Sequence, residues 1–233
     1  MRIDKFLANK ALGSRKEVHK LLSSGVVTVN GEVVRDKAFG MNPELDSIAV
    51  NGDSISGRQQ YYVKFHKPAG YLCAVEDASA PTVMDILPPE FLTMKVHPVG
   101  RLDKDTEGLL LLTNDGVWGH KIINGRKKVP KRYHATYEGT LTEEGLQRIR
   151  EGILLGDGTQ CKPATIESVG PNTVALIIEE GKYHQVKRMI GAAGGKVTYL
   201  KRLSIGPLTL EGIEEPGQFA FLTDDEMAAI ARF

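Results

Sequence analysis

The sequence predicts an α+β protein with two parts: a small domain of two helices and β-hairpins, then a larger domain on a mixed, largely antiparallel sheet. Helical spacing of apolar residues dominates only the first 25 positions, and two Asn-Gly pairs, at 30–31 and 51–52, follow between short strand-like runs. From residue 61 onward, apolar runs alternate with Gly- and Pro-rich turns, and helical patterns are few. The 233 residues are 41% hydrophobic, which suffices for a core and excludes disordered and collagen-like chains.

Two short helices are expected first. Apolar residues recur at helical spacing from Ile3 to Ala11, and Gly13 interrupts the pattern. Ser14 and Glu17 then have the spacing of a capping box, in which each side chain satisfies a backbone donor at the start of a helix. Gly25 is expected to end this second helix.

The two Asn-Gly pairs predict two tight hairpins, and the polar stretch 56–60 is a plausible linker. Strands are expected at 61–65, 108–113, 134–140, 173–179, 196–200 and 219–222, with a turn at 66–70. Helices are expected at 143–150, 184–193 and 224–231. We therefore predict domains at residues 1–57 and 60–233.

Composition narrows the classes of protein further. The N-terminus is charged from its first residues and lacks the apolar run of a signal peptide, and the longest apolar stretch is far too short for a membrane span. Cys73 and Cys161 are the only cysteines, too few for a disulfide framework or a cysteine zinc site. We expect a cytoplasmic monomer with no membrane partner.

The net charge of +1 conceals an uneven distribution. Residues 1–37 carry eight Lys and Arg against four acids, and the stretches 116–137 and 181–210 contain basic residues and no acid. A basic module with two basic patches indicates a polyanionic partner, although surface lysines also cluster by chance.

The densest polar cluster lies at residues 99–108, where Asp103, Asp105 and Glu107 alternate before an apolar run. This spacing resembles a calcium loop, but the twelfth position counted from Asp103 is Asn114 and not the Glu that an EF-hand requires. A charged turn leading into a buried strand is the plain structural interpretation, and composition alone leaves it open.

A second cluster, residues 179–190, joins the end of a strand to the start of a helix. Its apolar positions form one helical stripe, which directs Lys187 and Arg188 elsewhere, and Gly181 with the nearby amides offers a place for a phosphate. His184 alone is more often structural than catalytic. The six histidines show no metal-ligand spacing, so no metal is assigned.

In the third cluster, residues 130–137, Tyr133 lies among Lys131 and Arg132. Basic residues around an aromatic ring suit single-stranded RNA, since the charges meet phosphates and the ring stacks on a base. A tyrosine packed in the core is the alternative.

The N-terminal residues 2–7 (RIDKFL), Ser14-Arg15 and residues 25–31 (GVVTVNG) resemble the small RNA-binding domain of ribosomal protein S-four. That resemblance implies that the helical face and the following loop contact RNA backbone and shape. A basic helical cap without a ligand is the competing interpretation.

Residues 100–116 (GRLDKDTEGLLLLTNDG), the Lys131-x-Tyr133 pair and residues 181–189 (GKYHQVKRM) look like the motifs of the bacterial ribosomal RNA pseudouridine synthases of the small-subunit (RsuA) type. The resemblance covers nearly the whole chain. Lys182 departs from it, because many relatives carry Arg there, and so does Pro130, where the residue is often acidic.

By this resemblance Asp103 is the catalytic carboxylate, which either attacks C1′ of the uridine or removes its 2′ proton. Lys187 is its cationic partner, Tyr133 stacks on the target base, and Arg101 fills the gap left when the uridine flips out. The reaction needs no cofactor. The RNA-binding residues implied are Arg101, Lys131, Lys182 and Arg188, with Arg2, Lys5, Arg15, Lys16 and Lys20 in the N-terminal domain.

The expected reaction is site-specific conversion of one uridine to pseudouridine in 16S ribosomal RNA, free or in a small-subunit assembly intermediate. The small-subunit assignment rests on the resemblance at residues 116–120 and 180–189. The alternatives are the same chemistry on 23S RNA and a non-catalytic ribosome-assembly factor that binds RNA.

Overall fold

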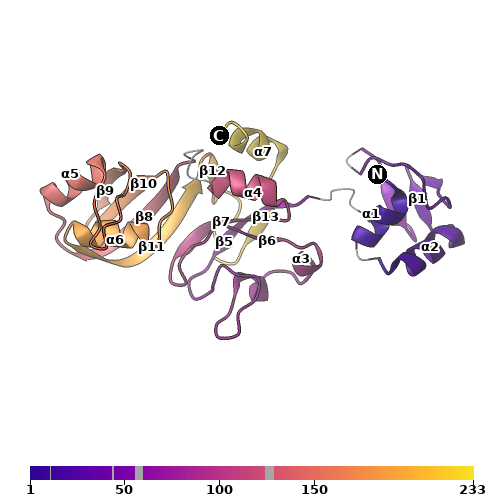
Figure 1. Cartoon of the computed structure of the whole chain (residues 1–233), viewed down its shortest axis with the longest axis horizontal. Helices are drawn as coiled ribbons and strands as arrows, with labels where there is room; N and C mark the ends of the chain where they lie inside the picture. Colours follow the sequence, from indigo (N-terminus) through magenta and orange to yellow (C-terminus); the bar gives the residue numbers. More distant parts are fainter. Residues whose placement is uncertain (11, 44, 56–59, 124–128) are drawn as a thin grey trace. The chain divides into compact units, whose positions relative to one another are not determined.

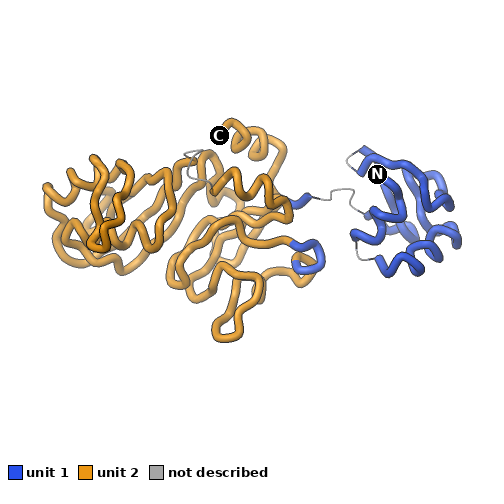
Figure 2. The backbone as a smooth tube through the Cα atoms, viewed as in Figure 1, with its two compact units in different colours: residues 1–61, 92–95 blue, residues 62–91, 96–233 orange. Residues whose placement is uncertain are grey.

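The computed structural model describes residues 1–10, 12–43, 45–55, 60–123 and 129–233. The chain divides into two compact units, Met1–Tyr61 with Leu92–Lys95, and Tyr62–Phe91 with Val96–Phe233 (Figure 2). The expected linker at 56–60 lies mostly outside the described residues, as does Ala11, so the exact boundary at 57–60 stays a prediction.

The N-terminal unit contains two helices and a small antiparallel sheet. The helices are α1 (Ile3–Asn9) and α2 (Arg15–Ser24) (Figure 1). The sheet has the strand order β2-β1-β3-β4. Apolar side chains of both helices and of the inner strands share one core. The strands are β1 (Val27–Val29), β2 (Glu32–Val33), β3 (Ile48–Val50) and β4 (Asp53–Ile55).

The local signals in this unit are confirmed. The Ser14 side chain accepts from the backbone N–H of Glu17 while the Glu17 carboxylate accepts from that of Ser14, and Gly25 ends α2 in a left-handed conformation. Asn30 and Asn51 both have positive φ, as tight turns between paired strands require, and β1–β2 and β3–β4 are antiparallel hairpins.

The larger unit is built on one nine-stranded sheet with the path β13-β5-β7-β11-β8-β10-β9, while β6 pairs with β7 and β12 with β11. The β7–β11 pair is parallel and the other pairs in this sheet are antiparallel, so the predicted fold class is confirmed. The strands are β5 (Tyr62–Lys67), β6 (His97–Val99), β7 (Glu107–Thr113), β8 (Lys131–Gly139), β9 (Thr165–Gly170), β10 (Thr173–Ile178), β11 (Gly195–Ile205), β12 (Leu208–Thr209) and β13 (Phe219–Phe221).

Apolar clusters pack helices against the sheet. One such cluster joins α5 (Glu143–Glu151) and α6 (Gln185–Ala192) to strands β8, β9 and β10, and another joins α4 (Gly116–Ile123) and α7 (Asp224–Ile230) to β7 and β12. The short helices η1 (Val83–Ile86) and α3 (Glu90–Thr93) complete the unit. No helix among the residues described is long and apolar enough to cross a membrane.

The main differences from the sequence-based elements occur around the central strands. The turn expected at 66–70 begins later, because His66 and Lys67 belong to β5, where both are fully buried. β8 begins three residues before the expected position and β11 runs five residues longer, to Ile205. β9 and α4 were not expected. In β5, β8 and β11 the residues outside the expected bounds include the buried charged residues Lys67, Lys131 and Arg202, which interrupt the apolar pattern and lie at or near the site described below.

Candidate active site

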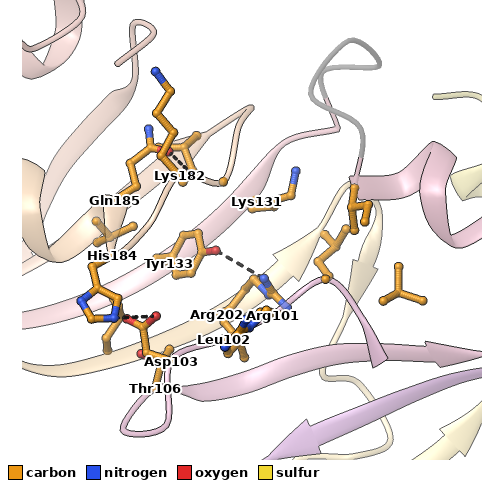
Figure 3. Close-up of a pocket in the computed structure, with 18 of the residues that line it drawn as sticks. Arg101, Leu102, Asp103, Thr106, Lys131, Tyr133, Lys182, His184, Gln185 and Arg202 are labelled. Carbon is orange, nitrogen blue, oxygen red and sulfur yellow. Dashed lines mark hydrogen bonds and ion pairs between the residues drawn. The ribbon is translucent and has the colours of Figure 1, made fainter. Parts of the chain in front are cut away.

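The site is a cavity of about 140 Å³ where β7, β11 and β8 meet (Figure 3). Its walls come from the loop before β7, the start of β8, the loop that leads into α6, and the middle of β11. The three clusters that the sequence singled out therefore contribute to one cavity. Polar side chains that line it are Arg101, Asp103, Thr106, Lys131, Tyr133, Lys182, His184, Gln185 and Arg202.

Asp103 lies in the loop between β6 and β7. The buried side chain of Lys67 in β5 donates hydrogen bonds to this loop. The buried Lys67 amine donates to the carbonyl oxygens of Pro68, Lys104 and Thr106, at 3.0, 3.2 and 2.8 Å. The backbone N–H of Thr106 donates to the carbonyl oxygen of Asp103 at 3.0 Å. A single lysine thus bonds to two carbonyl oxygens of the loop just after Asp103 and links this loop to the turn after β5.

The Asp103 carboxylate faces two side chains at the start of α6. The Lys187 amine lies 2.9 Å from one carboxylate oxygen, and His184 Nε2 lies 3.5 Å from the other. Lys187 also donates to Asp105 at 2.6 Å, so it bridges two carboxylates of the same loop. Asp103 is a quarter exposed at the mouth of the cavity, whereas Asp105 is mostly in solvent.

The environment keeps Lys187 charged. Partial burial by itself would lower the pKa of its amine, but the hydrogen bonds to Asp105 and Asp103 outweigh that effect and raise the pKa. The Lys187 amine and the Asp103 carboxylate are thus in contact, and the role of Lys187 as the partner of a catalytic carboxylate stays a prediction.

Tyr133 forms part of the cavity wall, and its ring is nearly buried. Its hydroxyl accepts from Arg202 Nη1 at 3.4 Å, across the β8–β11 pairing in which Tyr133 and Arg202 are opposite each other. Arg202 in turn donates from Nε to the carbonyl oxygen of Leu109 at 2.7 Å. This places a phenol, a guanidinium and a carboxylate around one small cavity.

Gly108 makes this junction possible. It has φ +114°, and a Cβ there would lie 2.2 Å from the carbonyl oxygen of Arg202. β7 and β11 can therefore approach closely enough to pair only with glycine at this position.

Comparison with known proteins identifies the larger unit. A model of the family described as RNA pseudouridylate synthase matches residues 61–192, and a model of the S4 domain matches residues 1–44. The chain belongs to the RNA pseudouridylate synthase family. The prediction of a pseudouridine synthase, an isomerase that carries an N-terminal S4 domain, is therefore confirmed.

Individual members of the RNA pseudouridylate synthase family match over the full chain. The Bacillus subtilis uncharacterized RNA pseudouridine synthase YtzG is 40% identical over 231 residues, 97% of each chain. Ribosomal small subunit pseudouridine synthase A of Escherichia coli K12 is 39% identical, covering 99% of this chain and 100% of that protein. A crystal structure of a pseudouridylate synthase matches with a TM-score of 0.68 at 34% identity over 99% of both chains.

The other basic residues proposed to bind RNA have varied surroundings. Arg101 lies exposed at the cavity. Lys182 donates to the carbonyl oxygen of Gln160, and Arg188 pairs with Asp157, so both contact the protein itself. In the S4 domain Arg2 pairs with Asp4 at 2.7 Å, while the side chains of Lys5, Arg15, Lys16 and Lys20 are exposed on or beside α1 and α2. The basic residues at 126–128 lie outside the described residues.

Lys67, Asp105 and Arg202 were not selected from the sequence as site residues. Lys67 was assigned to a turn, and Arg202 was counted only as one charge of a basic patch. The strand alternation that buries Leu200 also buries Arg202, so a cation at an inward position of a strand was the available signal. Among the described residues, no group of three or more His, Cys, Asp and Glu side chains could hold a metal ion.

Proposed function

We propose that this chain converts one uridine of 16S ribosomal RNA to pseudouridine, with Asp103 as the catalytic carboxylate on a flipped-out nucleotide. The observation that carries the proposal is the Asp103 carboxylate, 2.9 Å from the Lys187 amine at the mouth of a cavity walled by Tyr133. The full-length similarity to an enzyme named for the small ribosomal subunit supports the choice of RNA.

The reaction rearranges one nucleotide. The C1′–N1 bond breaks, the base rotates, C5 bonds to C1′, and the proton on C5 is exchanged for one on N1. Asp103 can attack C1′ or take the 2′ proton, and both roles need a carboxylate beside the ribose. Lys187 holds this carboxylate in position and favours its charged form. No bond outside the nucleotide changes, so the proposed chemistry uses no cofactor.

The cavity is too small for a stacked helix, so the target uridine must leave the stack to reach Asp103. In the proposal the ring of Tyr133 stacks on the base, and the exposed Arg101 occupies the space that the nucleotide leaves in the RNA. Lys182 and Arg188 contribute positive charge near the entrance, and Lys131 contributes it from the buried wall of the cavity.

We further propose that residues 1–57 capture the RNA and that residues 60–233 catalyse the isomerisation. Arg2, Lys5, Arg15, Lys16 and Lys20 would contact phosphates without reading sequence. The proposed enzyme acts as a monomer in the cytoplasm, on ribosomal RNA or on a small-subunit assembly intermediate.

Pseudouridine mapping of both ribosomal RNAs, in cells with and without the gene, tests this proposal. We expect one site to be missing from 16S RNA and to be restored by the wild-type gene but not by Asp103→Asn. A site missing from 23S RNA would support the proposed reaction but show that the substrate is 23S RNA. If no ribosomal site is lost, the proposal is wrong and a non-catalytic assembly factor or another RNA substrate takes its place.

A further inference from the structure

The inner wall of the cavity carries two buried cations without an ion-pair partner. Lys131 on β8 and Arg202 on β11 are 7% and 4% exposed, and neither forms an ion pair with any residue that the structure describes. The Lys131 amine donates to the carbonyl oxygen of Val129, at 2.8 Å, and to no other residue that the structure describes. Burial of a charge is costly unless it is paired, so this wall is suited to an anion.

The same wall holds polar atoms that lack a hydrogen bond. Within the described part of the chain, two buried side-chain polar atoms have no partner, Arg202 Nη2 and Thr106 Oγ1. Both residues line the cavity. Burial of unpaired polar atoms destabilises a protein, and their concentration at one cavity indicates that a ligand supplies the missing partners.

The surroundings of Lys131 agree with this interpretation. Burial and the neighbouring Arg202 charge lower the pKa of its amine to about 8, despite the opposing effect of Glu179. The amine is still mostly protonated at neutral pH, and an anion in the cavity would stabilise that form.

The depth of Lys131 and Arg202 in the cavity indicates which anion they bind, an RNA phosphate or the uracil base. Asp103, which acts on the ribose in the proposed function, is a quarter exposed at the mouth, whereas Lys131 and Arg202 are more than nine-tenths buried. A phosphate stays with the RNA backbone on the outer side of the ribose. The base is the part of a flipped nucleotide that extends farthest inward, and Arg202 lies beside Tyr133, whose ring is proposed to stack on it.

We propose that Arg202 and Lys131 bind the uracil base and stabilise the negative charge that it acquires when it detaches, with the Thr106 hydroxyl as a further hydrogen-bond partner. This inference rests on the proposed function, because it takes the ribose to lie at Asp103. When the C1′–N1 bond breaks, its electron pair leaves with the base, and the charge spreads over N1, O2 and O4. C1′ meanwhile bonds to the Asp103 carboxylate, or the sugar loses its 2′ proton to Asp103.

The later steps return the charge. C5 of the rotated base bonds to C1′ as Asp103 departs or gives back its proton, and the proton leaving C5 is replaced by one gained at N1. A fixed guanidinium and ammonium therefore act where charge develops and need not move during the reaction.

A binding experiment without RNA tests the charge preference. The probes are uracil, which is neutral just above neutral pH, and 6-azauracil, which has the same shape and is largely an anion there. We expect NMR titration of the full chain to show 6-azauracil binding about tenfold more tightly than uracil, and Arg202→Met and Lys131→Met to lose that preference. Arg148→Met, the same loss of charge on the exposed face of α5, should keep it. Equal affinity of the wild-type chain for the two bases would overturn the proposal.

Single-turnover kinetics on RNA separates the base from the phosphate. We expect Arg202→Met to slow conversion by about 10²–10³-fold with little change in RNA affinity. Fluorine at C5 stabilises the detached base, so the defect should shrink when cleavage of a 5-fluorouridine target is measured. If instead a methylphosphonate beside the target removes the difference from wild type, the cations bind a phosphate and the proposal is wrong.

Lys131→Met and Arg202→Lys carry the kinetic test if Arg202→Met fails to fold. The two proposals fail in different ways. A wild-type chain that modifies no ribosomal uridine overturns the proposed substrate, whereas an active wild type with an equally active Arg202→Met overturns only this inference.

Discussion

At the scale of single residues, the arrangement around Lys187 distinguishes two carboxylates that the sequence presents as equivalent. Asp103 and Asp105 both accept from this amine, but Asp103 faces the cavity and Asp105 faces solvent. Lys187 binding to both fixes the loop against α6. The catalytic role proposed for Asp103 therefore has a matched control two positions away.

Asp103→Asn is expected to reduce pseudouridine formation by about a thousandfold or more, because an amide cannot attack C1′ or take a proton. Asp105→Asn should stay within about tenfold of wild type, since Asp103 keeps its contact with Lys187. Tritium release from C5-labelled RNA measures both rates, and filter binding should give RNA affinities within several-fold of wild type. Similar losses in the two variants would contradict the assignment of Asp103.

Lys131 offers a prediction about stability. Its pKa is lowered from 10.5 to about 8 in the folded chain, chiefly by burial. Below pH 8 both the folded and the unfolded chain carry the proton, so the folded state bears the full cost of the buried charge. Between pH 8 and 10.5 the unfolded chain binds more protons, and stability contributed by this group rises with pH.

Lys131→Met should therefore raise the free energy of unfolding at neutral pH by about 1–2 kcal/mol, after allowing for the lost hydrogen bond to Val129. The advantage should shrink as pH rises above 8, because wild-type Lys131 then loses its charge. Urea denaturation across this pH range measures the difference. A Lys131→Met variant that is more stable but less active would show that the charge of Lys131 serves function. A destabilised variant would show that Lys131 has a structural role.

At the scale of elements, the conformation of the loop before β7 depends on hydrogen bonds from Lys67, a buried residue of β5. Lys67 is as deeply buried as an apolar core residue, and burial lowers the pKa of its amine, yet it donates to three carbonyl oxygens. Within the described residues, Lys131 makes a single such bond, to Val129. Substitution by Met should therefore lower the free energy of unfolding at Lys67 and raise it at Lys131.

Lys67→Met is expected to destabilise the larger unit by about 1–3 kcal/mol, because the carbonyl oxygens of Pro68, Lys104 and Thr106 lose the hydrogen bond from this amine. The loop carrying Asp103 should become mobile, so conversion should slow even in the folded population. Hydrogen exchange of residues 102–106 together with single-turnover rates checks both effects. Unchanged protection in this loop would show that its own hydrogen bonds suffice.

At the scale of the whole molecule, the two units have separate apolar cores. The α2 capping box, both hairpin turns and the core of the N-terminal unit use residues of that unit alone. Each unit therefore has the contacts of an independently folding domain.

Deletion of residues 1–57 should leave 60–233 folded and weaken RNA binding, with a shallower dependence of affinity on salt because fewer phosphates are neutralised. Circular dichroism and binding at several salt concentrations test this. The full chain with Lys5, Lys16 and Lys20 changed to Gln is the control that keeps the domain intact, and it should lose part of the same salt dependence. An unfolded deletion product would instead show that the first unit supports the second.

Local signals determined much of this protein from sequence. The capping box of α2, the two Asn-Gly hairpins, the buried stripe of α6 and the apolar run of β7 were predicted correctly because each depends on neighbours within a few residues. Motif resemblance supplied the enzyme class and the candidate residues Asp103, Tyr133 and Lys187. The cap, the hairpins and the apolar stripes require only local chain geometry and the burial of apolar side chains, which the local sequence specifies.

The tertiary structure alone decided which polar groups are buried and what they touch. The positions of Lys67, Arg202 and Thr106 depend on the pairing of β7 with β5 and β11, strands far apart in sequence, and Gly108 allows the closest approach. A lysine or arginine in a sequence is expected at the surface, because burial of its charge is unfavourable. Long-range strand pairing brings the carbonyl oxygen of Thr106 to Lys67 and that of Leu109 to Arg202, and only the finished cavity shows which cations and polar atoms still lack a partner.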